Sequence, residues 1–103
     1  MSDIRDIAIE IADLVDKKNK DYNNAFDETL DKYGDVAYFI RMEDKLSRLR
    51  NIIQNGAFIN ESVEDTLNDI VGYTLLLISH KKRKLDEVEK LWDNIKDDAE
   101  SLE

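Results

Sequence analysis

Apolar residues recur at steps of three and four along most of this chain, a spacing that places them on one face of an α-helix. The pattern predicts four main helices, over residues 4–20, 35–55, 60–79 and 81–102, and a short helix over residues 25–33. Gly34 and Gly56 stand just past two of these helices, and the chain contains no proline to interrupt them. We therefore expect an all-α fold, an antiparallel bundle of four main helices plus a short one, in a single domain over residues 1–103.

The last predicted helix, residues 81–102, has the most regular spacing. Its apolar positions alternate steps of three and four, as in the a/d seam of a coiled coil: Leu85, Val88, Trp92, Ile95, Ala99 and Leu102. The seam suits one packing surface, either the domain's own bundle or the same helix of a second subunit. We expect this helix to serve packing or oligomerisation, in a homo-oligomer that is a dimer or larger.

A basic run, His80–Lys84, separates the last two predicted helices. Such a run at a helix junction is more often a solvated hinge than a phosphate site. The sequence therefore predicts a junction here.

Two aspartates mark the helix over residues 60–79. Asp65 and Asp69 lie one turn apart, and Gly72 and Leu76 continue the same line. Residues 70–78 are apolar almost all round, which is typical of a helix covered by other helices, so the line is expected to run into the interior. A buried carboxylate is costly unless it is paired or binds a metal.

Glu43 interrupts the apolar stripe of the preceding helix, where an acid is unusual. One interpretation is an ion pair or hydrogen bond, for instance with Arg50 or Ser47. The other is that Glu43 faces Asp65 and Asp69 and that the three acids hold Mg²⁺, which prefers oxygen ligands and leaves coordination positions for phosphate oxygens. In that case nearby cations would meet the remaining phosphate charge, and the candidates are Lys18, Arg41, Lys45 and Arg48.

The net charge of −9 argues against direct binding of nucleic acid, which needs a basic surface. It is compatible with solubility alone, with a divalent cation or with a basic partner, including a role as an acidic inhibitor that mimics nucleic acid. Interior carboxylates count against mimicry, because buried acids cannot face a partner.

The chain has no cysteine, no apolar run long enough for a membrane span and no signal-peptide pattern, so a cytoplasmic protein is expected.

Three segments in order, KNKDYNNAF, IRMEDKLSRL and ESVEDTLNDIVGYTLL, resemble the phage and bacterial family called nucleotide modification associated domain 1. That family is related to the MazG-like all-α nucleoside triphosphate pyrophosphatases. The resemblance implies an oligomeric helical bundle that holds Mg²⁺ with acids of two adjacent helices. The implied reaction is the hydrolysis of a nucleoside triphosphate to the monophosphate and pyrophosphate.

The resemblance also implies roles for individual residues. The second acidic motif falls on Asp65 and Asp69 as metal ligands, with Glu61 one turn earlier, and the first falls on Glu43 and Asp44. Glu61 or Asp44 would orient the attacking water. Lys18, Asp21 and Tyr22 match a lysine–aspartate–tyrosine element that is expected to contact base or sugar.

This sequence departs from the family pattern at two points. Leu46 and Ser47 stand one turn after Glu43, where MazG-like enzymes carry a second acid, and the second motif has aspartate where glutamate is usual. Three functions therefore stay open. The first is a Mg²⁺-dependent nucleotide pyrophosphohydrolase, and the second is a non-catalytic nucleotide binder, for example a phage protein that sequesters a signalling nucleotide. The third is an acidic protein-binding inhibitor, such as a mimic of nucleic acid.

Overall fold

A computed structural model of the chain describes residues 3–56 and 60–101, with side chains described over 3–56 and 63–99. It contains four helices and no strand within these residues: α1 (Ile4–Asp21), α2 (Ala25–Tyr33), α3 (Val36–Gln54) and α4 (Asn60–Ser101). The expected all-α fold is thus confirmed. None of the described helices is both long and apolar enough to cross a membrane.

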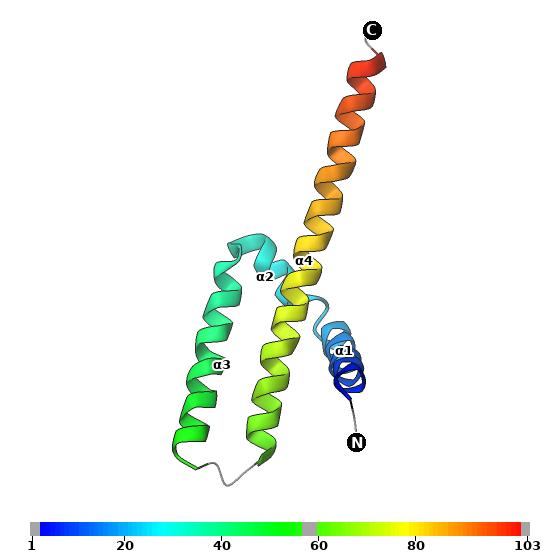
Figure 1. Ribbon diagram of the computed structural model, residues 1–103. Coiled ribbons are helices and arrows are strands. Elements are labelled where there is room, and N and C mark those ends of the chain that lie inside the picture. Colours follow the sequence, from blue (N-terminus) through cyan, green and yellow to red (C-terminus); the bar gives the residue numbers. More distant parts are fainter. Residues whose placement is uncertain (1–2, 57–59, 102–103) are drawn as a thin grey trace.

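The four helices form an elongated molecule of 70 × 32 × 23 Å (Figure 1). The first half of α4 lies between α3 and α1, and α3 runs antiparallel to α4. Helix α2 lies across the N-terminal end of α3. The second half of α4 projects beyond the other helices. Its described side chains from Lys81 onward are all exposed.

The prediction of a junction at His80–Lys84 is wrong, because α4 passes through this run without a break and has 42 residues. The helix continues here because the basic run is paired with acids of another segment. These acids lie on and just after α2 and are spaced four residues apart. The pairs are Asp27 with Arg83, Asp31 with His80 (2.8 Å) and Lys84 (3.0 Å), and Asp35 with Lys81 (2.7 Å). The basic residues therefore attach α2 to the middle of α4 and do not form a hinge.

The links between the first three helices are short and use left-handed backbone. Asn23 and Asn24 have φ of 52° and 58° between α1 and α2, and Gly34 has φ of 78° between α2 and α3. Asparagine and glycine tolerate this region better than other residues. These turns bring α2 back across α4.

The core is small and lies where α2, α3 and α4 meet. Phe26, Leu30 and Ala37 are buried, and four partly buried residues pack against them: Tyr38, Tyr73, Leu76 and Leu77. Helix α1 contributes no buried residue. It contacts α4 at Gly72, where a Cβ atom would lie only 3.1 Å from Val15 Cγ2, so the missing side chain permits the close approach. A hollow is left between α1 and the rest of the bundle.

Candidate functional site

Asp69 lies at the junction of three helices. Its carboxylate accepts a hydrogen bond of 2.9 Å from Lys45 Nζ on α3, and Lys18 Nζ on α1 lies 3.8 Å from its other oxygen. The Asp69 side chain is 33% exposed and that of Lys45 is 23% exposed. The acid expected to be buried is therefore partly buried and already paired with two cations.

The other predicted metal ligands lie on the surface. Glu43 and Asp65 are both exposed, so the expectation that the aspartate line runs into the interior is wrong for Asp65. Asp44 is exposed as well, and the side chain of Glu61 lies outside the described residues. Within the described part of the chain, no three acids or histidines lie close enough together to hold a metal ion.

The main cavity of the site has a volume of about 440 Å³ and opens between α1 and the other three helices. Its apolar wall is formed by Ile11, Leu14, Val15, Ala25, Phe26, Gly72 and Leu76, and its polar wall by Lys18, Asn19, Tyr22, Thr29, Arg41, Asn68, Asp69 and Tyr73. This volume falls in the range of pockets that hold small organic ligands.

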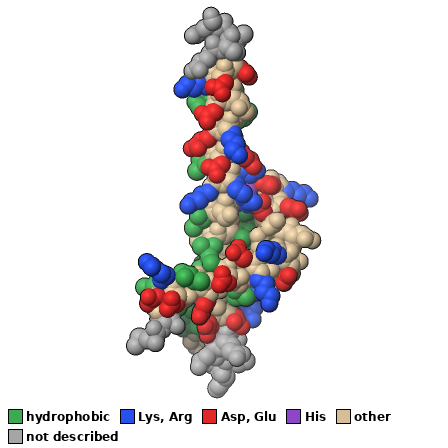
Figure 2. All heavy atoms as spheres, turned by 90° about the vertical axis from the view of Figure 1, so that its right-hand side faces the viewer, with side chains coloured by type: hydrophobic (Ala, Val, Ile, Leu, Met, Phe, Trp, Pro, Cys, Tyr) green, Lys and Arg blue, Asp and Glu red, His purple; other side chains and the backbone are tan. Residues whose placement is uncertain are grey.

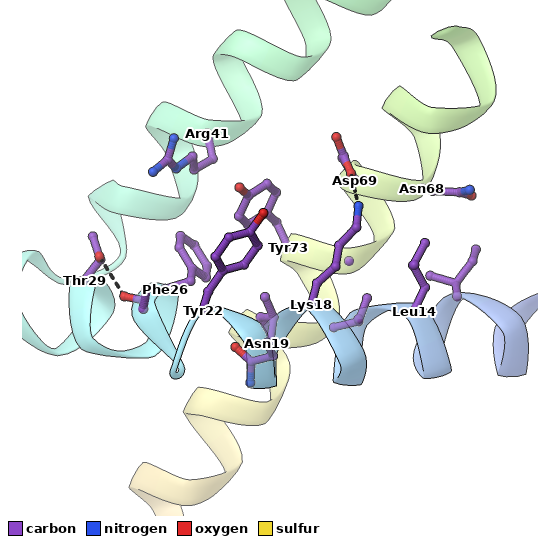
Figure 3. A pocket seen from close by; sticks show the side chains of 15 residues that line it. Leu14, Lys18, Asn19, Tyr22, Phe26, Thr29, Arg41, Asn68, Asp69 and Tyr73 are labelled. Carbon is purple, nitrogen blue, oxygen red and sulfur yellow. Dashed lines mark hydrogen bonds and ion pairs between the residues drawn. The ribbon is translucent and has the colours of Figure 1, made fainter. Parts of the chain in front are cut away.

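Aromatic rings gather in one part of this cavity (Figure 3). The Phe26 and Tyr73 rings pack edge to face with centroids 4.9 Å apart, and the Arg41 guanidinium lies 6.0 Å from the Tyr73 ring centroid. Tyr22, at the end of α1, lines the same cavity although its side chain is 69% exposed. An exposed ring beside a packed aromatic pair can stack on a planar ligand.

A second hollow, of about 330 Å³, adjoins the first on the side of Lys18 and Asp69. Both hollows are lined by Leu14, Lys18, Asn68 and Asp69, and the second adds Arg48, Asp65 and Thr66. The two hollows thus form one site, with aromatic rings at one end and charged side chains at the other.

The structure brings together most of the predicted nucleotide-contacting residues. Lys18, Tyr22, Arg41 and Arg48 line the site, and Lys45 reaches it through Asp69. Asp21 is exposed and lies outside both linings, as do Glu43 and Asp44. Asp65 and Asp69 do share the second hollow.

Of the three aromatic residues that line the cavity, the sequence analysis predicted only Tyr22. Phe26, which is buried, and Tyr73 were not predicted as site residues. The available signal was the phenol of Tyr73 inside the otherwise apolar run 70–78, because a buried tyrosine hydroxyl usually needs a polar neighbour.

Comparison with protein families gives one match, to the family described as nucleotide modification associated domain 1, over residues 18–79. No curated protein and no solved structure matches the chain. The matched residues contain most of the site, from Lys18 on α1 to Leu76 on α4, and end where α4 begins to project. Ile11, Leu14 and Val15, which also line the cavity, precede them. The chain belongs to the nucleotide modification associated domain 1 family.

Proposed function

We propose that this protein binds a phosphorylated nucleotide in the two-part site, with the base among the aromatic rings and the phosphates toward Lys18 and Arg48. The observation that carries the proposal is the continuity of the two hollows around Lys18 and Asp69. A nucleotide has the same division, a flat apolar base at one end and a polyanion at the other. The family's printed description, which refers to nucleotides, agrees with this assignment.

The base end offers stacking and polar contacts. Tyr22 can close over a base that rests near Tyr73, and stacking on an aromatic ring is worth about 1–3 kcal/mol per base. The side-chain amides of Asn19 and Asn68 supply donors and acceptors for the edges of a base or sugar. Nothing in this set is selective for one base, so the proposal extends to nucleotides as a class.

A protein with a net charge of −9 repels an anionic ligand, so the phosphates need cationic side chains close by. Of the two lysines at Asp69, Lys18 is the more available, because its side chain is 53% exposed and it lies 3.8 Å from Asp69, which is long for a hydrogen bond. A phosphate can therefore recruit Lys18 while Lys45 continues to neutralise Asp69. Arg48 adds a planar donor pair that suits a phosphate group.

Magnesium fits this site only as an ion that arrives with the phosphates. Mg²⁺ is commonly held by one or two carboxylates plus substrate phosphates and water. Asp65 and Asp69 would hold it here, while Glu43, the third expected ligand, does not line the site. The ion would supply charge neutralisation of the phosphate chain.

These carboxylates favour retention of an intact nucleotide over its hydrolysis. Asp69 is engaged by two lysines, and no third acid joins Asp65 and Asp69 among the described residues. The pyrophosphohydrolase activity expected from the MazG-like relation is therefore the second candidate function, and product analysis separates the two.

The test is a panel of nucleoside mono-, di- and triphosphates, with and without Mg²⁺, measured by thermal shift and calorimetry. A ligand at 100 times its Kd stabilises the folded state by about 2.7 kcal/mol. We expect one class of nucleotide to raise the melting temperature of the wild type and to lose most of its effect in Tyr22→Ala. The matched control is Tyr33→Ala, which removes another exposed tyrosine, outside the site.

Chromatography of the bound nucleotide then reports its chemical state. Recovery of intact ligand supports the binding role, and release of monophosphate with pyrophosphate assigns hydrolysis. A panel without any shift, or equal binding by the Tyr22 and Tyr33 variants, overturns the proposed site.

A further inference from the structure

An exposed apolar line runs along α4 and does not end with the bundle. Val71, Ile78, Leu85 and Trp92 are spaced seven residues apart, and these residues are 40%, 47%, 62% and 66% exposed. Figure 2 shows hydrophobic side chains between charged ones on the projecting part of the helix. A strict seven-residue apolar repeat is typical of a helix that supercoils around another.

On the projecting half of α4, both alternating positions of the seven-residue repeat are apolar and exposed. Val88 and Ile95 occupy the alternate positions and are 62% and 52% exposed. On the bundle half the alternate positions are polar and contact the other segments of the same chain, because Thr74 bonds Tyr38 at 2.9 Å and Lys81 bonds Asp35 at 2.7 Å. We call the exposed set the α4 seam: Val71, Ile78, Leu85, Val88, Trp92 and Ile95.

We propose that the α4 seam is the interface of a homodimer, in which a second copy of this chain packs its α4 in parallel and in register. The seam is complementary to itself, since a two-fold axis places each residue against its own counterpart. Nothing within the described chain covers it, and a monomer would leave Trp92 and Leu85 in water. Because the family match ends at residue 79, the projecting half of the seam is a feature of this chain outside the matched domain.

Charge decides between the two directions of packing. In a parallel, in-register pair, Lys84 flanks the seam opposite Glu89 of the second copy, an attractive combination. An antiparallel pair that covers the same length, with Val71 opposite Ile95 of the second copy, brings Lys82 beside Lys82 and Lys84 beside Lys84. Like charges at these positions disfavour that arrangement.

The dimer can be tested by the mass of the intact protein in solution, from light scattering after size exclusion. We expect twice the 12.0 kDa of one chain for the wild type. The double variant Leu85→Glu/Trp92→Glu should be monomeric, and its helical circular dichroism reports whether it is folded. The matched control is Lys90→Glu, on the opposite face of the same projecting helix, which should remain dimeric. A monomeric wild type, or a double variant that remains dimeric, overturns the proposal.

The direction of packing is tested with single cysteines, since the chain has none of its own. Val88→Cys places two thiols face to face in the parallel, in-register dimer, within the distance that a disulfide spans. We expect oxidation to give a covalent dimer of Val88→Cys and none of Lys90→Cys. A dimer that does not cross-link through residue 88, or that cross-links equally through residue 90, overturns the parallel arrangement.

Discussion

Lys45 Nζ donates a 2.9 Å hydrogen bond to Asp69 Oδ2 and so joins α3 to α4 inside the site. The same carboxylate faces Lys18 of α1, which makes Asp69 the one described acid paired with lysines from two other helices. An acid that the sequence offered as a metal ligand is thus a structural contact between helices. Its variants therefore have to be measured for stability as well as for ligand binding.

The Lys45–Asp69 pair is expected to contribute to stability. Because both side chains are only partly exposed, loss of the pair should cost about 1 kcal/mol of the free energy of unfolding. Urea unfolding of Lys45→Met, Asp69→Asn and the double variant measures the coupling between the two. Lys17→Met, on the exposed face of α1, is the control. A double variant whose loss equals the sum of the single losses would show that the pair contributes nothing.

Lys18 is expected to act on the phosphates and not on the base. Hydrogen bonds to charged groups contribute about 1.5–3 kcal/mol, so Lys18→Ala should lower the affinity for a nucleoside triphosphate about tenfold or more. The affinity for the corresponding nucleoside should change little. Calorimetry with both ligands makes the comparison, and Lys17→Ala should match the wild type. Equal losses for nucleoside and triphosphate would contradict this assignment.

Asp65 is expected to carry the magnesium-dependent part of binding. Asp65→Asn keeps the size of the side chain and removes its charge, so the gain in nucleotide affinity on addition of Mg²⁺ should shrink or disappear. The affinity without metal should stay the same or rise, because a negative charge near the phosphates is lost. Asp44→Asn, on the exposed surface of α3, should retain the full Mg²⁺ effect. If both variants respond to Mg²⁺ like the wild type, Asp65 holds no metal.

Alanine at residue 72 is expected to be accommodated better when Val15 is made smaller. A Cβ at residue 72 would lie 3.1 Å from Val15 Cγ2, which is tighter than ordinary contact, so the Val15 side chain must move slightly away. Alanine is also the better helix former by about 1 kcal/mol. Gly72→Ala should therefore be more favourable in a Val15→Ala background than in the wild type, as judged by thermal unfolding. An identical effect in both backgrounds would mean that α1 does not press on Gly72.

Acid is expected to weaken the attachment of α2 to α4. The hydrogen bond from His80, together with the one from Lys84, holds the pKa of Asp31 below its usual value of 3.8. A carboxyl whose pKa is lower in the folded state stabilises the fold above its unfolded pKa, and this contribution is lost as the pH falls through the folded pKa. Between about pH 5 and pH 2, the free energy of unfolding should therefore decrease more in the wild type than in Asp31→Asn.

Urea titrations at several pH values test this difference, with Asp44→Asn as a control that should follow the wild type. Parallel curves for the wild type and Asp31→Asn would show that the Asp31 contacts do not contribute. The comparison is independent of the ligand site, since Asp31 lines neither hollow.

Local patterns were sufficient for the helices and for part of the site. The three- and four-residue spacing predicted helices close to the observed α1, α2 and α3, because one turn of helix depends on neighbouring residues alone. The same spacing identified the a/d seam of the last helix from Leu85 to Ile95. Tyr22 was expected from the resemblance to the family, and Lys18 from that resemblance and from its charge; both line the cavity. Leu102, the last expected residue of the a/d seam, lies outside the described residues.

Long-range contacts required the tertiary structure. The continuity of α4 through His80–Lys84 depends on acids on and just after α2 that lie about fifty residues earlier, so no local rule distinguishes this run from a hinge. In the same way, the pairing of Asp69 with Lys45 joins residues 24 positions apart. A periodic pattern identifies the apolar face of a helix, but it does not identify which helix will meet that face.

The sequence by itself therefore determined the helical class, which rests on local spacing, and the family, which rests on the resemblance of three segments and on the match over residues 18–79. It also named Lys18 and Arg48, two of the charged residues that line the hollows. Only the tertiary structure decided that Phe26 and Tyr73 meet, that Glu43 stays on the surface and that Asp69 faces two lysines. The physical reason is that these outcomes depend on how α1 and α3 are placed against α4. That placement follows from packing at Gly72 and from ion pairs between distant segments.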